Sequence, residues 1–120
     1  MITIYHNPRC SKSRETLALV QALADEQHLS LQVIDYQKTP LSYTELQSLL
    51  LALDSSDVQM ILRNNEDAYA SLNLADADNA TALQAIAAHP KLLQRPIVTY
   101  QNKAAIGRPP EHVLSLFKKA

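Results

Sequence analysis

The hydrophobic pattern at the start of the chain predicts two strands separated by a helix. Residues 1–5 are β-branched, apolar or aromatic and stop before Asn7-Pro8, which favours a short buried strand. Apolar residues recur at helical spacing from about Ser11 to Gln27, with no Pro or Gly between them. Residues 31–36 predict a second strand. A strand, a helix and a strand in so short a span form a βαβ unit, so we expect the two strands to be parallel.

The middle of the chain has only helical patterns. Ser42-Tyr43-Thr44-Glu45 is a capping box, and the apolar face behind it consists of Leu46, Leu49, Leu50 and Leu53. Three further helical segments are expected: one that Ser55 or Ser56 begins and that runs through Leu62, one from Glu66 to Leu72, and one from Asn79 or Thr81 to His89-Pro90.

The last quarter of the chain predicts a hairpin followed by a helix. Residues 96–100 favour a strand, residues 101–103 a tight connection, and residues 104–106 a returning strand. Pro109-Pro110 opens a final helix. Its inward-facing residues are expected to be Val113, Leu114 and Phe117.

The order of these elements predicts the fold class. It is β-α-β, then helices, then β-β-α, which without the helical block is the order of a thioredoxin-like α/β fold with a mixed four-stranded sheet. We expect residues 1–120 to form a single thioredoxin-like domain with a helical insertion at about 40–90.

Composition excludes several classes of function. The formal net charge is −1, whereas a general nucleic-acid binder is basic. One cysteine cannot form an internal disulfide framework or a cysteine-rich zinc site, and no H-x₃-H or H-E-x-x-H spacing occurs, so we expect no metal. One glycine, Gly107, excludes Walker A loops and G-x-G-x-x-G turns.

The sequence predicts a cytoplasmic protein without a membrane segment. Its first ten residues have neither the basic nor the apolar region of a signal peptide. The longest apolar run, Leu49 to Leu53, is far shorter than the roughly 20 residues that a membrane span needs. A lone thiol in such a chain is typical of a reducing compartment. We expect a monomer that binds neither nucleic acid nor membrane.

Cys10 is the first candidate for chemistry. It lies between a predicted strand and a predicted helix, where free backbone N–H groups and the helix dipole stabilise a thiolate. Arg9, Lys12 and Arg14 add positive charge nearby in the sequence. The alternative is a buried, inert cysteine, which is common for a lone thiol.

The residues that follow Cys10 exclude two classes of cysteine chemistry. Ser13 stands where a Cys-x-x-Cys motif has its second cysteine, and Thr16 stands where the phosphate loop of cysteine phosphatases has an arginine. A nucleophile without a resolving thiol must pass its intermediate to an external thiol.

Three arginines could bind an oxyanion. Arg95 precedes Pro96 at the start of a strand, Arg108 lies at a strand-to-helix turn, and Arg63 ends an apolar helical stretch. Guanidinium groups bind tetrahedral oxyanions bidentately and keep their charge. By analogy with thioredoxin-like folds, we expect Pro96 to be cis and to face the cysteine loop. The alternative is that these are solvated surface arginines.

Among the four histidines, only His6 is a candidate functional residue. It lies just before Cys10 and could tune the thiol or orient the loop, and a purely structural role is the alternative. Asn7 is expected to hydrogen-bond the loop backbone or cap the helix. His28 and His112 are expected to be exposed, and His89 to end a helix.

Four motifs in order resemble the glutaredoxin-coupled arsenate reductase family. Residues 6–14, His-Asn-Pro-Arg-Cys-Ser-Lys-Ser-Arg, resemble its active-site loop. Arg95-Pro96-Ile97-Val98 and residues 107–111 resemble its two later signatures, and residues 62–76 its central helical block. The resemblance covers nearly the whole chain. Ser11-Lys12 stands where the best-known members have Gly-Thr.

The resemblance implies roles for five residues. Cys10 falls on the catalytic cysteine, His6 on a loop histidine that favours the thiolate, and the oxyanion-binding arginines are Arg63, Arg95 and Arg108. In that family the thiolate attacks arsenate, glutathione displaces the arsenic, glutaredoxin clears the mixed disulfide, and arsenite is released. The resemblance implies glutathione as co-substrate, glutaredoxin as partner, and no metal or tightly bound cofactor.

Two other functions stay open from the sequence. One is a thiol reductase of the same fold that acts on another substrate with glutathione. The other is a regulator that binds RNA polymerase without catalysis, although such proteins usually carry a Cys-x-x-Cys switch where this chain has Ser13.

Overall fold

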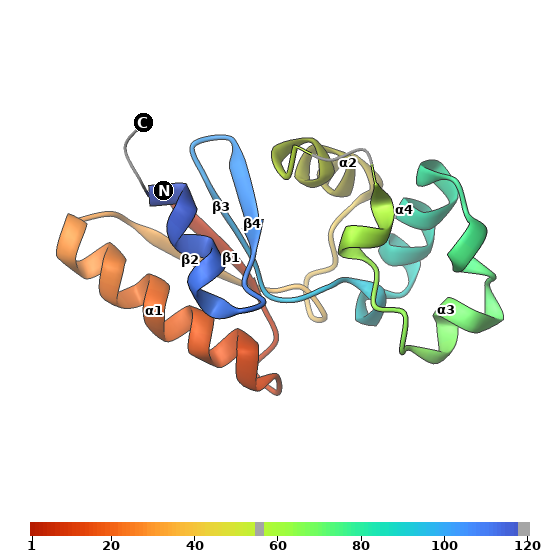
Figure 1. The fold of residues 1–120 in the computed structure, drawn as a ribbon, viewed down its shortest axis with the longest axis horizontal. Coiled ribbons are helices and arrows are strands. Elements are labelled where there is room, and N and C mark those ends of the chain that lie inside the picture. Colours follow the sequence, from red (N-terminus) through yellow and green to blue (C-terminus); the bar gives the residue numbers. More distant parts are fainter. Residues whose placement is uncertain (55–56, 118–120) are drawn as a thin grey trace. The chain divides into compact units, whose positions relative to one another are not determined.

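The computed structural model describes residues 1–54 and 57–117, and the chain divides into two compact units (Figure 1). One unit contains Met1–Tyr36 and the chain from Arg95 onward, and the other is Gln37–Gln94. Each unit is described by itself. That they form a single domain with an insertion at about 40–90 stays a prediction.

The first unit is built on a four-stranded mixed sheet. Its elements are β1 (Ile2–His6), α1 (Ser11–Gln27), β2 (Leu31–Asp35), β3 (Ile97–Tyr100), β4 (Lys103–Ile106) and the 3₁₀-helix η4 (Pro110–Phe117). The strand order is β2-β1-β3-β4, with β1 parallel to β2 and the other neighbours antiparallel. The predicted α/β fold class, with parallel first strands and a C-terminal hairpin, is confirmed.

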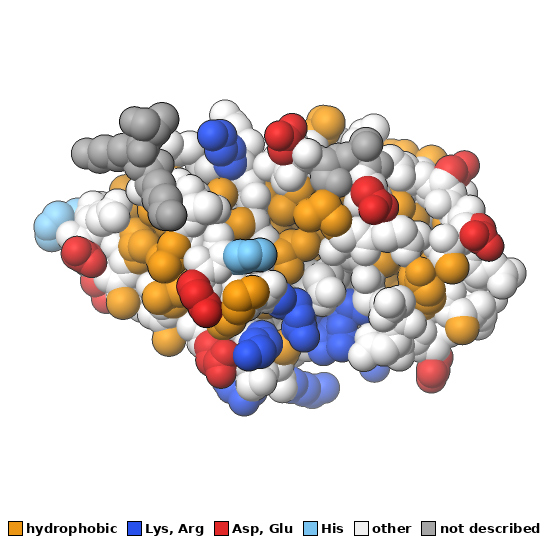
Figure 2. Space-filling model, viewed as in Figure 1, with side chains coloured by type: hydrophobic (Ala, Val, Ile, Leu, Met, Phe, Trp, Pro, Cys, Tyr) orange, Lys and Arg blue, Asp and Glu red, His pale blue; other side chains and the backbone are white. Residues whose placement is uncertain are grey.

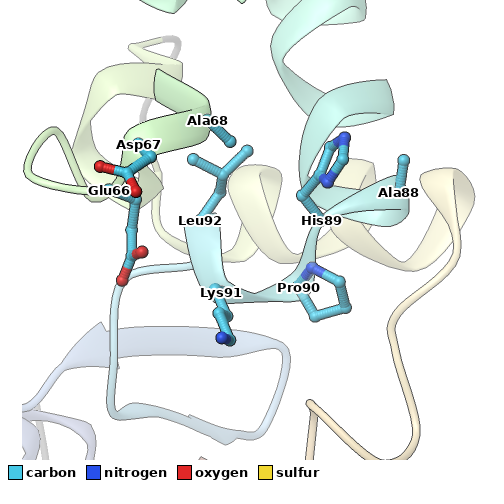
Figure 3. A pocket seen from close by; sticks show the side chains of 8 residues that line it. All are labelled: Glu66, Asp67, Ala68, Ala88, His89, Pro90, Lys91 and Leu92. Carbon is cyan, nitrogen blue, oxygen red and sulfur yellow. The ribbon is translucent and has the colours of Figure 1, made fainter. Parts of the chain in front are cut away.

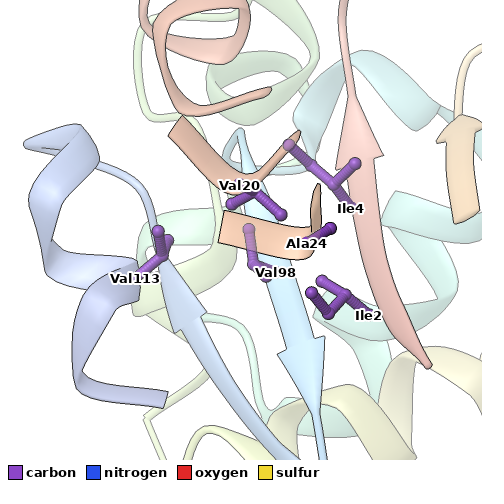
Figure 4. Close-up of a cluster of buried hydrophobic side chains, with 6 residues drawn as sticks. All are labelled: Ile2, Ile4, Val20, Ala24, Val98 and Val113. Carbon is purple, nitrogen blue, oxygen red and sulfur yellow. The ribbon is translucent and has the colours of Figure 1, made fainter. Parts of the chain in front are cut away.

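The core of this unit lies between one face of the sheet and the helices α1 and η4. Ile2 and Ile4 share a face because strand side chains alternate, and Ile4 pairs with Val98 on β3. Val20 and Ala24 of α1 and Val113 of η4 pack against them (Figure 4). Complete burial of a side chain such as Ile2 contributes about 1.5–3 kcal/mol, so this cluster anchors α1 to the sheet.

In the described part of the second unit, residues 37–54 and 57–94, the regular elements are all helices, as the sequence pattern predicts, and one isolated β-bridge joins Leu62 to Leu93. The helices are α2 (Tyr43–Ala52), η1 (Val58–Ile61), α3 (Asp67–Ser71), η2 (Leu74–Asp76), α4 (Asn79–Ala88) and η3 (Pro90–Leu92). The predicted capping box is present: the Glu45 N–H donates to Ser42 Oγ at 3.1 Å, and the Ser42 N–H donates to Glu45 Oε1 at 3.0 Å. At the start of α4, the Asp78 side chain accepts the Thr81 N–H at 2.8 Å.

Two predicted helices have 3₁₀ geometry. Ser55 and Ser56, expected to begin the segment through Leu62, lie outside the described residues, and Asp57 accepts the Gln59 N–H at the start of η1. The last helix, η4, is also 3₁₀, and of its three predicted inward residues only Val113 is fully buried. Residues three apart share a face in a 3₁₀-helix, so Leu116 packs with Val113 where the α-helical pattern selected Leu114.

On the face shown in Figure 2, charged side chains of both signs lie among groups of exposed hydrophobic ones. The large hydrophobic residues with the most exposure are Met1, Val33, Leu51, Met60 and Leu72. Within residues 1–54 and 57–117, no helix combines the length and the apolar character needed to cross a bilayer.

Candidate active site

The loop between β1 and α1 is a hydrogen-bonded turn that ends at Cys10. The Cys10 N–H donates to the Asn7 carbonyl at 3.0 Å, and the Arg9 N–H donates to Asn7 Oδ1 at 3.0 Å. Asn at the first position and Pro at the second suit this kind of turn. Asn7 is buried, which confirms its expected part in holding the loop. Cys10 is the N-cap residue of α1, as its position in the sequence predicts.

The environment of the Cys10 sulfur favours a thiolate. Burial by itself raises the pKa of the half-buried thiol. A hydrogen bond from the Ser13 backbone, a hydrogen bond from the Arg95 side chain together with its positive charge, and a hydrogen bond from the Lys12 backbone all lower it. These contacts outweigh burial, so the pKa lies below the ordinary value of a cysteine. Lys12 therefore lowers the pKa of the thiol through its backbone N–H.

The buried Ser13 side chain connects the loop to His6. Its Oγ lies 2.7 Å from His6 Nδ1 and accepts the Asn7 N–H at 2.9 Å. Ser13 is fully buried and His6 is 7% exposed, so neither group can exchange this partner for water without a local opening. The hydroxyl therefore ties the end of β1, the loop and the first turn of α1 together.

His6 is joined to this loop by a hydrogen bond to Ser13. Burial lowers the pKa of its imidazole, and the positive charge of Arg14 lowers it further. The carboxylate of Asp35, which pairs with His6 across β1 and β2, opposes this shift without overcoming it. The neutral ring holds Ser13, whose backbone N–H faces the sulfur.

The sheet brings Arg95 and Arg108 to the same edge as Cys10. Ile97 at the start of β3 pairs with Tyr5 near the end of β1 and with Ile106 at the end of β4. The segments just outside these pairs, which carry Cys10, Arg95 and Arg108, must then converge.

Contacts within this group join the two arginines to the site. The Arg95 side chain donates a hydrogen bond to the Cys10 sulfur. Arg108 Nη1 donates to the Arg95 carbonyl at 3.1 Å. The Arg95-Pro96 bond is cis, as expected, and so is Arg108-Pro109.

Arg63 lies in the helical unit and is fixed there. Its backbone N–H donates to the Leu92 carbonyl at 2.8 Å, and its Nη1 lies 2.6 Å from Glu66 Oε1. The two side chains are only 15% and 28% exposed, so this ion pair is well shielded. The expected role of Arg63 toward an oxyanion stays a prediction.

A cavity of about 360 Å³ lies in the helical unit. Glu66 and Asp67 line one side, His89 and Pro90 the other, and Leu92 lies between them (Figure 3). Lys91 also lines the cavity, so its lining contains both acidic and basic side chains.

The other three histidines lie outside the Cys10 loop, and of them His89 lines the cavity of the helical unit. His28 and His112 are exposed, as expected, and His89 follows the last residue of α4. Among residues 1–54 and 57–117, no three His, Cys, Asp or Glu side chains are placed to hold a metal ion.

The chain is similar to known proteins over nearly its whole length. Residues 5–116 match the ArsC family. The chain belongs to the ArsC family. It is 44% identical over 117 residues to an arsenate reductase of Haemophilus influenzae, covering 96% of this chain and 97% of that protein, and equally identical to the uncharacterized protein YfgD of Escherichia coli K12, of which it covers 95%. A solved arsenate reductase from Vibrio cholerae has a TM-score of 0.85 at 44% identity and covers 96% of each chain.

Three residues of this ArsC chain make contacts in the sheet unit that the sequence pattern did not show. Ser13 and Thr16 are fully buried polar residues on the apolar side of α1, about two turns and one turn before Val20. Their spacing of three and four residues continues the apolar stripe, which was the available signal. Asp35 reaches His6 only through strand register, which no local pattern reveals.

We expect Ser13→Ala to destabilise the fold by about 1–3 kcal/mol, because the Asn7 N–H and His6 Nδ1 would lose their buried partner. Urea unfolding measures this loss. Ser115→Ala is a matched control, since Ser115 is an exposed serine on η4, and its effect should stay within about 0.5 kcal/mol. Equal stabilities of the two variants would contradict the bridging role of Ser13.

We expect the imidazole of His6 to titrate below pH 6.5, the ordinary value, as followed by NMR of its ring protons. Because the pKa is lower in the folded chain, the unfolded chain binds the proton first as pH falls. The stabilising contribution is therefore complete above about pH 6.5 and is lost progressively below it. Asp35→Asn should lower the pKa of His6 further, since the carboxylate raises it. A higher pKa of His6 in the Asp35→Asn variant would contradict the pKa-raising effect assigned to the Asp35 carboxylate.

Proposed function

We propose that this chain is an arsenate reductase in which the Cys10 thiolate is the nucleophile and glutathione and glutaredoxin supply the electrons. The observation that carries the proposal is the contact between Arg95 and the Cys10 sulfur. It places a permanently charged, anion-binding group beside a nucleophile whose pKa is lowered. Family membership and the arsenate reductases among its relatives support the choice of substrate.

Each residue has a defined task in this proposal. Cys10 attacks the arsenic atom as a thiolate. Arg95 and Arg108 bind the oxygens of arsenate and offset the charge that develops during attack. Arg63 is proposed as the third oxyanion-binding arginine. His6 and Ser13 hold the loop so that the backbone N–H groups stay aimed at the sulfur.

The proposed reaction balances with two external thiol steps. The Cys10 sulfur forms a bond to arsenic(V) and water leaves. The glutathione thiol then bonds to the Cys10 sulfur, the sulfur–arsenic bond breaks, and its electron pair stays on arsenic, which departs as arsenite. Two thiols have become one mixed disulfide, and arsenate has gained two electrons. Glutaredoxin takes the glutathionyl group from Cys10 and so regenerates the Cys10 thiol. A second glutathione then removes that group from glutaredoxin as glutathione disulfide.

An external reductant is proposed because the chain has a single cysteine and so cannot form an internal disulfide. The chemistry needs no metal or tightly bound cofactor. Arsenate and phosphate have nearly the same shape and charge, so selection between them rests on the reaction itself. Arsenic(V) accepts electrons from thiols and phosphorus(V) does not.

We expect Cys10→Ser to abolish arsenate reduction, because the serine hydroxyl is not ionised near neutral pH and cannot form the disulfide. The measurement is arsenate-dependent NADPH oxidation in the presence of glutathione, glutaredoxin and glutathione reductase. Thermal unfolding of the variant should match the wild type, which separates loss of the nucleophile from loss of the fold.

Two results would contradict the proposal. Activity of the Cys10→Ser variant at the wild-type level would exclude Cys10 as the nucleophile. A wild-type protein that reduces another oxidant with glutathione but shows no arsenate-dependent turnover would exclude arsenate as the substrate.

A further inference from the structure

Gly107 is enclosed on two sides by side chains of the sheet unit. A Cβ atom added at this position would lie 2.6 Å from Thr16 Oγ1, 2.9 Å from Thr16 Cγ2 and 2.8 Å from Pro96 Cγ. All three distances are shorter than real Cβ contacts. The backbone of Gly107 does not have a positive φ, so conformation is not what requires glycine here. The requirement is space between α1 and the Pro96 ring.

Thr16 supplies the α1 side of this contact and is itself tightly held. It is fully buried, and its hydroxyl donates to the Lys12 carbonyl at 2.8 Å within the first turns of the helix. The same oxygen lies 3.4 Å from the Gly107 carbonyl. The side chain is thus a fixed spacer rather than a mobile one.

Gly107 in turn connects both arginine-bearing turns. Its N–H donates to the Pro96 carbonyl at 2.9 Å, next to Arg95, and Arg108 follows it directly in the chain. Arg108 Nη1 returns to the Arg95 carbonyl. These contacts close a ring that runs from α1 through Thr16, Gly107 and Arg95 to the Cys10 sulfur at the start of the same helix.

We propose that Thr16 and Gly107 are positioning residues whose close contact sets the distance between Cys10 and the turns that carry Arg95 and Arg108. Neither residue needs to touch the oxyanion. A methyl group at position 107 would push the arginine turns away from α1, whereas a shortened side chain at position 16 would let them move toward it. Oxyanion binding depends on geometry, and misplacement by about 1 Å can cost as much as about 100-fold in rate.

The test compares Gly107→Ala with a matched pair at position 16. Thr16→Ala removes the spacer, whereas Thr16→Val replaces the hydroxyl by a methyl group and keeps the β-branched side chain. For each variant the measurements are the Cys10 thiol pKa from absorbance at 240 nm, the protection of Cys10 from iodoacetamide by phosphate, the KM for arsenate, and the Tm. Val113→Ala is the control for destabilisation, because Val113 is buried in the same unit away from the ring.

We expect Gly107→Ala and Thr16→Ala to raise the thiol pKa and to weaken phosphate protection and raise the arsenate KM by about tenfold. Thr16→Val should stay close to the wild type in these measurements, and Val113→Ala should lower only the Tm. If Gly107→Ala does not fold, the pair at position 16 decides.

Two outcomes would overturn the inference. One is a wild-type thiol pKa and phosphate protection in Thr16→Ala and in any folded Gly107→Ala, whatever their Tm. The other is a Thr16→Val variant as impaired as Thr16→Ala. The KM measurement rests on the proposed function, but the thiol pKa and phosphate protection do not. A wild-type protein inactive on arsenate would therefore count against that function alone.

Discussion

The hydrogen bond and charge contact between Arg95 and the Cys10 sulfur is the interaction on which the rest of the site depends. The two residues are far apart in the sequence, and only the sheet brings them together. Because β3 runs antiparallel to both β1 and β4, the end of β1, the start of β3 and the end of β4 meet at one edge. The order of strands is thus also the reason that the thiol and the two arginines share a site.

The thiolate is stabilised by a balance between opposing effects. Burial disfavours the charged sulfur, and donors from two sources overcome that penalty: the first backbone N–H groups of α1 and the Arg95 guanidinium. The backbone donors are held by the loop, which depends on Asn7 and on the contact between Ser13 and His6. The site therefore relies on polar groups that are themselves buried, and such groups lose much when one partner is removed.

Local patterns predicted the elements well because local physics sets them. The capping box of α2, the helix from Ser11 to Gln27 and the turn at Asn7-Pro8 all follow from neighbouring residues. The sequence also identified Cys10 and Arg95 as candidate site residues, because each lies where a predicted helix or strand begins. Local patterns did not reveal the pairing of Asp35 with His6, or why Gly107 must be glycine, because both depend on contacts between distant segments. The inward face of η4 was predicted in part only, because the expected α-helical spacing does not apply to a 3₁₀-helix that packs against α1 and β4.

The rate of Cys10 alkylation by iodoacetamide as a function of pH, with and without arsenate and in the absence of any reductant, gives the thiol pKa and tests the central claim most directly. The account predicts a thiol pKa below the ordinary value of a cysteine in the free protein. It also predicts that arsenate slows alkylation of Cys10 in a manner that saturates, because the oxyanion occupies the arginines beside the sulfur. An ordinary or raised thiol pKa, together with alkylation that arsenate does not affect, would contradict it.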